Sequence, residues 1–144
     1  MKTINTEIII NASAQNVWNT LMDFDKHPEW NPFITKLTGE AKVGEKLHVE
    51  IQPPNQKLST FTPKVLTVQP NKHFSWRGTF LASFVMAGEH NYEIEELEPN
   101  KVKFKHYENF TGVLAGIIMK KIGEDTQKGF QMMNEAIKAR AEAM

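Results

Sequence analysis

The sequence of 144 residues contains no cysteine. This absence excludes disulfide bonds, thiol catalysis and metal sites built on thiolates. The chain also has no excess of charge, because Lys plus Arg and Asp plus Glu each number 17. A neutral chain lacks the positive surface with which proteins bind nucleic acid or an anionic membrane. We therefore expect no nucleic-acid partner and no stable membrane association.

Long apolar runs and catalytic signatures are missing as well. The longest apolar runs, such as GVLAGIIM at 112–119, are far shorter than the roughly 20 residues that span a membrane. The first ten residues, MKTINTEIII, alternate like a strand and do not resemble a signal peptide. No G-x-S-x-G, H-E-x-x-H or phosphate-loop motif is present, so we expect no cofactor. The sequence predicts one cytoplasmic domain covering residues 1–144, as a monomer or a homodimer.

The amino-terminal third changes from a strand pattern to a helical one. Residues 3–10 read as a strand, and Ser13 is a suitable N-cap for a helix that follows. Pro28 suits the first turn of a second short helix, and Pro32 ends it. The apolar residues of the first helix recur at helical spacing: Val17, Trp18, Leu21 and Phe24.

The rest of the chain predicts a sheet and then one long helix. From about residue 33 to 110, some six strands with one apolar and one polar face are separated by turn signals, as in antiparallel sheets covered on one side. The last thirty residues carry a single apolar stripe at spacings of three and four, with a possible kink at Gly123. The stripe consists of Leu114, Ile117, Ile118, Ile122, Thr126, Phe130, Met133, Ile137 and Ala141.

The widths of these elements predict a cavity. About seven strands at roughly 4.8 Å spacing form a sheet more than 30 Å wide, whereas one helix covers about 10 Å. The sheet must therefore curve around the helix, and part of its concave face stays uncovered. We predict an α+β fold in which a curved seven-stranded antiparallel sheet and the long carboxy-terminal helix enclose a hydrophobic cavity.

Three polar residues fall on an apolar strand face between residues 86 and 110. Alternate positions place His90, His106 and Glu108 on the side that carries the phenylalanines. With a three-residue loop in the hairpin, His90 lies opposite Glu108 and Tyr92 lies opposite His106. An unpartnered buried carboxylate costs several kcal/mol, so these groups are unlike ordinary core residues.

Three interpretations of this group are open. It is a polar patch that orients a hydrophobic ligand in a cavity, a structural His–Glu pair between two strands, or a metal site with two imidazoles and one carboxylate. We favour the first, in which no metal is bound. Glu108, His106 and His90 are also the candidates for acid–base catalysis. The candidate ligand-binding residues are His90, Tyr92, His106, Glu108, Trp30, Trp76, Phe74, Phe84, Met86, Phe104 and Phe110.

Two further assignments concern residues near turns. Trp30 lies where the short helices return to the sheet, so it either forms the cavity mouth or serves as a buried structural residue. His27, His48 and His73 fall near turns or on the outer face, and we expect them to be exposed.

Several segments resemble the bacterial SRPBCC group, the polyketide cyclase-like branch of the START/Bet v 1-like superfamily. They are VWNTLMDFDKHPEWNPFI, KVGEKLHVEIQPP, FSWRG, GEHNYEIEEL, FKHYENFTG and GFQMMNEAIKARAE. The resemblance covers essentially the whole chain. It implies a helix-grip fold, with seven antiparallel strands around a long carboxy-terminal helix and a hydrophobic pocket that takes lipids, sterols or polyketides.

The resemblance leaves the function open, because one fold hosts many activities. Our leading hypothesis is binding of a small, mainly hydrophobic molecule, oriented by the His/Glu patch. The second is a cyclase, dehydratase or hydrolase acting on a carbonyl substrate, with Glu108 as acid or base. The third is a co-chaperone-like interaction module, which needs an exposed apolar patch on the outer sheet face.

Overall fold

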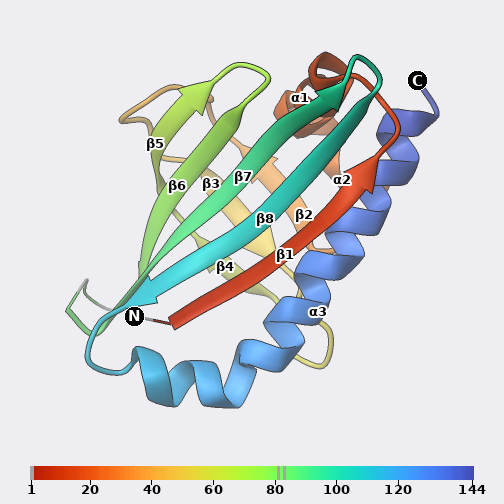
Figure 1. Cartoon of the computed structure of the whole chain (residues 1–144). Helices are drawn as coiled ribbons and strands as arrows, with labels where there is room; N and C mark the ends of the chain where they lie inside the picture. The colour runs from red at the N-terminus through yellow and green to blue at the C-terminus, as the bar shows by residue number, and fades with distance from the viewer. Residues whose placement is uncertain (1, 81, 83) are drawn as a thin grey trace.

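The computed structural model describes residues 2–80, 82 and 84–144, which form two antiparallel sheets and a long carboxy-terminal helix (Figure 1). The larger sheet has the order β1 (Lys2–Ile10), β8 (Lys101–Thr111), β7 (Met86–Glu98), β6 (His73–Phe80) and β5 (Lys64–Gln69). The smaller sheet has the order β2 (Ile34–Thr38), β3 (His48–Ile51) and β4 (Ser59–Phe61). The predicted α+β helix-grip fold is confirmed, but its strands divide into five plus three instead of forming one sheet of seven.

The short helices follow β1, as predicted from their caps. Helix α1 (Ala14–Met22) begins after Ser13, whose Oγ accepts a hydrogen bond of 3.1 Å from the backbone N–H of Asn16. A 3-10 turn, η1 (Phe24–Lys26), leads into α2 (His27–Trp30), and Pro28 lies in the first turn of α2. Figure 1 shows these helices at the end of the larger sheet that is opposite the start of α3.

Helix α3 (Ala115–Glu142) packs along the concave side of the larger sheet. Its predicted apolar stripe is right from Thr126 onward, where Phe130, Met133 and Ile137 are fully buried. The stripe is wrong at Leu114 and Ile117, which are 40% and 65% exposed. The reason is visible in Figure 1, where the first turns of α3 run along the lower end of the molecule before the helix turns up beside β1.

The β7–β8 hairpin has the predicted register. His90 pairs with Glu108, and Tyr92 pairs with His106. The turn between Glu98 and Lys101 contains two residues instead of the predicted three, and an irregularity between Glu96 and Glu98 restores the register. All four side chains therefore face the concave side of the sheet.

Two hydrophobic clusters fill the space under the sheet. The larger one includes Phe74, Tyr92 and Phe104 and is covered by α1 and the second half of α3. The smaller one, at the lower end, contains Met86, Phe110, Ala115 and Met119. In the part of the chain that the structure describes, no helix is both long and apolar enough to cross a membrane.

Candidate functional site

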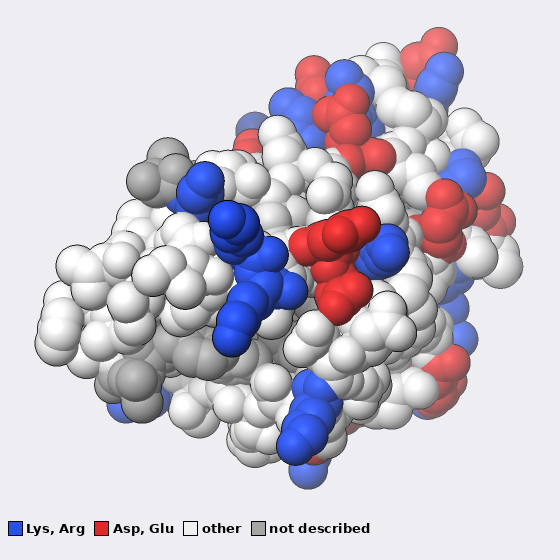
Figure 2. Space-filling model, turned by 90° about the horizontal axis from the view of Figure 1, so that it is seen from below, with Lys and Arg blue, Asp and Glu red and all other residues white. Residues whose placement is uncertain are grey.

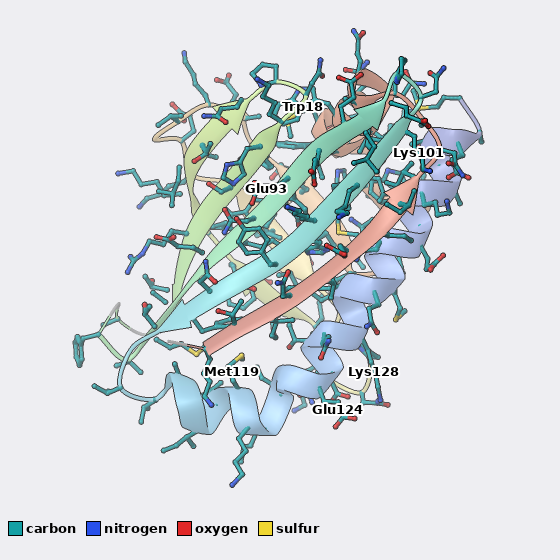
Figure 3. The ribbon with its side chains drawn as sticks, in the orientation of Figure 1. Trp18, Glu93, Lys101, Met119, Glu124 and Lys128 are labelled. Carbon is teal, nitrogen blue, oxygen red and sulfur yellow. The ribbon has the colours of Figure 1, made fainter. Side chains whose placement is uncertain are left out.

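A cavity of about 110 Å³ lies between the larger sheet, the smaller sheet and the first half of α3. Figure 3 labels Met119, on the part of α3 that closes this cavity below the larger sheet. The wall is mainly apolar and includes Phe33, Val49, Trp76, Met86, Phe110 and Met119. Among the described residues that line the cavity, two are ionisable: His90 on β7 and Glu108 on β8.

The Glu108 carboxyl group lies at the cavity wall and contacts His90 from one side. Its Oε1 is 3.2 Å from His90 Nδ1, and the side chains are 17% and 1% exposed. Gly88, on the neighbouring strand, makes room for the second oxygen, because a Cβ atom at this position would overlap Glu108 Oε2. A glycine in a strand interior marks such a close approach. The carboxyl group is thus positioned at the cavity by its contact with His90 and by the space that Gly88 leaves for Oε2.

Behind Glu108, hydrogen bonds continue from the cavity into the protein. His90 Nε2 lies 2.7 Å from His106 Nε2, and His106 Nδ1 lies 3.0 Å from Asn134 Oδ1. Asn134 Nδ2 donates to Thr6 Oγ1 over 2.9 Å, and Thr6 Oγ1 donates to the backbone carbonyl of His106 over 2.7 Å. This network links β7, β8, α3 and β1, and we call it the Glu108–Thr6 chain.

The hydrogen-bond partners determine where the protons of the chain lie. A carbonyl oxygen only accepts, so the Thr6 hydroxyl donates to the carbonyl of His106 and accepts from Asn134. The Asn134 oxygen then faces His106, so His106 carries its proton on Nδ1 and has a lone pair on Nε2. His90 must therefore donate to His106 through Nε2–H.

Burial keeps the deeper members of this region uncharged. Burial lowers the pKa of His106 well below 6.5, with a smaller effect of His90 in the same direction. Hydrogen bonds to Asn134 and to the Phe130 backbone oppose this shift. The neutral ring stacks on Phe130, with the ring centroids 4.1 Å apart. Burial also raises the pKa of Tyr92 well above 10, so its hydroxyl stays protonated.

Some of the predicted ligand-binding residues line the cavity, and others lie in the core behind it. Trp76, Met86, His90, Glu108 and Phe110 line it. The core holds Tyr92, His106, Phe74 and Phe104, all nearly or fully buried. These residues share a sheet face with the cavity wall, but α1 and the second half of α3 cover that part of the face.

The structure corrects the prediction for Phe84 and places Trp30 away from the cavity. Phe84 is 71% exposed, because β7 begins only at Met86 and the strand alternation does not extend to the preceding turn. It lies beside Val113, whose N–H donates to the Phe84 carbonyl. Figure 2 views this lower end of the molecule, where uncharged surface borders a group of Lys and Arg side chains. Trp30 is half-buried, and its ring centroid lies 4.8 Å from that of His27.

The prediction that His27 is exposed is wrong. Its ring is fully buried, because α2 packs against β2 and α3, and Nε2 lies 2.8 Å from the carbonyl oxygen of Leu21. Its Nδ1 lies 3.1 Å from Asn31 Nδ2, while Asn31 Oδ1 accepts from the backbone N–H groups of Phe33 and Ile34. His27 therefore carries its proton on Nε2, and burial lowers its pKa.

The two imidazoles and the carboxylate do not converge on a common point. Two nitrogens bound to one tetrahedral Zn²⁺ at about 2.0 Å lie about 3.3 Å apart, with both lone pairs aimed at the ion. Instead, the Nε2 atoms of His90 and His106 are 2.7 Å apart and share a hydrogen bond, and Glu108 contacts the other nitrogen of His90. No group of three His, Asp or Glu side chains suited to a metal ion occurs among the residues that the structure describes.

Comparison with known proteins agrees with this architecture. A family model described as "Polyketide cyclase / dehydrase and lipid transport" matches residues 1–142. The chain belongs to this family. A search of curated protein sequences gave no match.

Several solved structures share the fold of this polyketide cyclase family member. The Zhui aromatase/cyclase from Streptomyces sp. R1128 has a TM-score of 0.79 and 15% identity, over 98% of this chain and 93% of that one. A START superfamily protein from Mycobacterium smegmatis has a TM-score of 0.71 and 18% identity, over 98% and 97% of the two chains. A point mutant of norcoclaurine synthase from Thalictrum flavum, in complex with a transition-state analogue, has a TM-score of 0.71 and 16% identity, over 97% and 93%.

In this family member, sequence reasoning missed Gly88, Asn134 and Thr6. Asn134 carried a usable signal, since it lies four residues after Phe130 of the predicted apolar stripe and therefore on the same face of the helix. Thr6 carried a weaker signal. Strand alternation places it on the inner face of the first strand, but it does so for every core residue of that strand. Gly88 lies on the predicted apolar face, where a glycine indicates the close approach of another group.

Proposed function

We propose that this protein binds a small, mainly apolar molecule in the cavity, and that the carboxyl group of Glu108 binds the polar group of that molecule. The observation that supports this proposal is a carboxyl group at the wall of a mainly apolar cavity. Ligand sites typically combine an apolar lining with a few placed polar groups. Placing a carboxyl group here costs free energy that a purely structural wall would avoid.

The size of the cavity supports a ligand of about one aromatic ring. Its volume of about 110 Å³ is below the 300–1,000 Å³ typical of pockets for drug-sized ligands. A dry cavity of about 150 Å³ is known to hold benzene. The aromatic side chains of Phe33, Trp76 and Phe110 offer ring surfaces to such a molecule.

An enzyme that uses the same residues is the second candidate. Glu108 and His90 form a carboxyl–imidazole pair in a place that a substrate can reach, and such pairs transfer protons. The family description includes cyclases and dehydrases, which supports a carbonyl-containing substrate. Turnover of such a compound by the wild type, lost in Glu108→Leu, would favour this candidate over binding alone.

Methionine methyl groups provide a direct test of ligand binding. Met86 and Met119 line the cavity, whereas Met133 lies in the main core and Met144 is exposed, so the latter two are internal controls. In ¹³C-methyl NMR with toluene as the probe, we expect saturable shifts of Met86 and Met119 and small shifts of the controls. Equal shifts of all four methyl groups, or none, would contradict binding in the cavity.

The role of Glu108 is tested by adding a polar group to the probe. Phenol should bind more tightly than toluene to the wild type, and Glu108→Leu should remove this difference while toluene still binds. Glu95→Leu is the matched control, because Glu95 is a half-exposed carboxylate on the same hairpin that pairs with Lys105. Phenol and toluene binding equally to the wild type would contradict a role for Glu108.

A further inference from the structure

The hydrogen bonds of the Glu108–Thr6 chain leave the proton of one close contact, between His90 and Glu108, unassigned. Starting from Thr6, the donor or acceptor role of each group determines the role of the next one. The last role determined in this way is that of His90, which donates through Nε2–H to His106. What remains is the contact of 3.2 Å between His90 Nδ1 and Glu108 Oε1. Without a proton, two lone pairs would face each other there, and a second proton on either carboxyl oxygen would leave an imidazolium without a counter-ion at a mainly apolar cavity.

We propose that Glu108 and His90 together hold one transferable proton, located between Oε1 and Nδ1, so that Glu108 Oε2 offers the cavity only a hydrogen-bond acceptor. This inference rests on the proposed function, because it specifies which polar group the cavity binds. The proton is either on the carboxyl group beside a neutral imidazole or on an imidazolium beside a carboxylate. In both arrangements Oε2 carries no hydrogen.

The class of ligand follows from this acceptor. A group that only accepts, such as an ether oxygen, would place its lone pair against that of Oε2. A cation is disfavoured, because Glu108 and His90 are neutral as a pair, and an added charge in a mainly apolar cavity would lack a counter-ion. The group that fits is therefore a neutral donor, and a hydroxyl group on a small apolar molecule supplies it.

Hydroxyl groups in the wall are compatible with a hydroxyl ligand. Thr126, on α3, donates its proton to the backbone carbonyl of Ile122 over 2.8 Å, so it offers only an acceptor as well. Ser59, on β4, also lines the cavity and can donate to the oxygen of the ligand. A bound hydroxyl group thus donates to Glu108 and can accept from Ser59.

His106, Asn134 and Thr6 are positioning residues in this arrangement. They do not line the cavity, but they set the tautomer of His106 and thereby the donor role of His90 Nε2. Thr6→Val keeps the shape of the side chain and removes the hydroxyl that orients the Asn134 amide. We expect this variant to free the Asn134 amide and change the tautomer of His106, while Glu108 Oε2 stays an acceptor and phenol still binds more tightly than anisole.

The proton positions are testable in the ligand-free protein. Long-range ¹H–¹⁵N NMR spectra distinguish the two tautomers of each histidine. We expect His106 with its proton on Nδ1, and His27 with its proton on Nε2 from the same reasoning applied to an unconnected site. His48→Gln and His73→Gln assign the remaining signals. A proton on Nε2 of His106 would overturn the neutral Glu108–His90 pair and with it the exclusion of cations, because His90 would then donate from Nδ1 to a carboxylate, and this measurement does not depend on any ligand.

The acceptor role of Oε2 is tested with phenol and anisole, read from the Met86 and Met119 methyl groups. Phenol should bind the wild type at least about tenfold more tightly than anisole, which has no donor. Glu108→Leu, which removes the acceptor, should reduce this ratio below about threefold, whereas Thr6→Val should keep it. Anisole binding as tightly as phenol to the wild type would overturn the proposal.

Glu108→Gln sharpens the same test. His90 Nδ1 then accepts from the amide N–H₂, and the amide oxygen takes the place of Oε2 as an acceptor. We therefore expect Glu108→Gln to keep a preference for phenol that Glu108→Leu loses. If Gln and Leu lose it equally, the acceptor arrangement is overturned. If no probe binds the wild type, the proposed function fails, and the histidine tautomers still decide the proton arrangement.

Discussion

This molecule contains two buried histidine–asparagine pairs whose hydrogen-bond networks end on different kinds of group. In the pair of His27 and Asn31, the hydrogen bonds end on backbone groups in both directions. In the pair of His106 and Asn134, one direction ends on Thr6, but the other passes through His90 to Glu108 at the cavity. The first network is closed inside the protein, whereas the second is open to a ligand.

The comparison shows that burial and residue type do not identify a functional histidine. Burial lowers the pKa of both His27 and His106, so both are neutral. The difference lies in the last atom of each network, which is a backbone group in one case and a carboxyl oxygen at a cavity in the other. The closed network should therefore matter for stability and the open one for ligand selection.

The largest effect is expected when the closed network is broken. Asn31→Leu leaves the buried N–H groups of Phe33 and Ile34 and the Nδ1 atom of His27 without partners, each costing about 1–3 kcal/mol. We expect a loss of about 3 kcal/mol or more in the free energy of unfolding, measured by urea denaturation. Asn5→Leu, an identical change at an exposed position on β1, is the control and should cost less than about 0.5 kcal/mol. A similar loss in both variants would contradict the importance of the closed network.

The matching change in the open network should cost less. In Asn134→Leu, His106 keeps the carbonyl of Phe130 as a hydrogen-bond acceptor, so the main loss is the donor to Thr6. We expect a loss of about 1–2 kcal/mol in urea denaturation, with the preference for phenol over anisole retained, because His106 keeps its tautomer and Glu108 keeps its acceptor. A loss larger than that of Asn31→Leu would reverse the comparison and make the open network the main structural element.

The pH dependence of stability should contain a contribution from each network. The unfolded chain binds protons at these histidines near pH 6.5, whereas the folded chain binds them only at lower pH. Since the unfolded state then holds more protons, the free energy of unfolding decreases as the pH falls below 6.5, by up to about 1.4 kcal/mol per pH unit for each histidine. Urea denaturation between pH 7 and 5 measures this slope.

Single substitutions separate the two contributions. His27→Gln and His106→Gln should each make the pH dependence less steep, because each removes one group whose pKa is lowered by folding. His48→Gln is the control, since His48 lies on β3 with a side chain that is 42% exposed. An unchanged slope in His106→Gln would show that this ring does not gain a proton on unfolding.

Sequence reasoning predicted the architecture and the pairing across the hairpin, because strand alternation and the helical stripe are local signals. It placed Phe74, Phe104, Tyr92 and His106 at the cavity because alternation identifies a face of the sheet and not the position of the helix over that face. His27 was missed because its burial depends on how α2 packs against β2 and α3, which no local pattern reports. The participation of Asn134 likewise depends on where α3 lies against the sheet.

The smallest change in stability is expected at the open end of the network. Glu108→Gln keeps a hydrogen-bonding partner for His90 at a position that is 17% exposed, so the free energy of unfolding should change by less than about 0.5 kcal/mol. Urea denaturation with Glu95→Gln as the control measures this change. A loss as large as that of Asn134→Leu would mean that Glu108 mainly holds β7 and β8 together. The site would then be a second structural network, and the distinction between the two histidine–asparagine pairs would no longer hold.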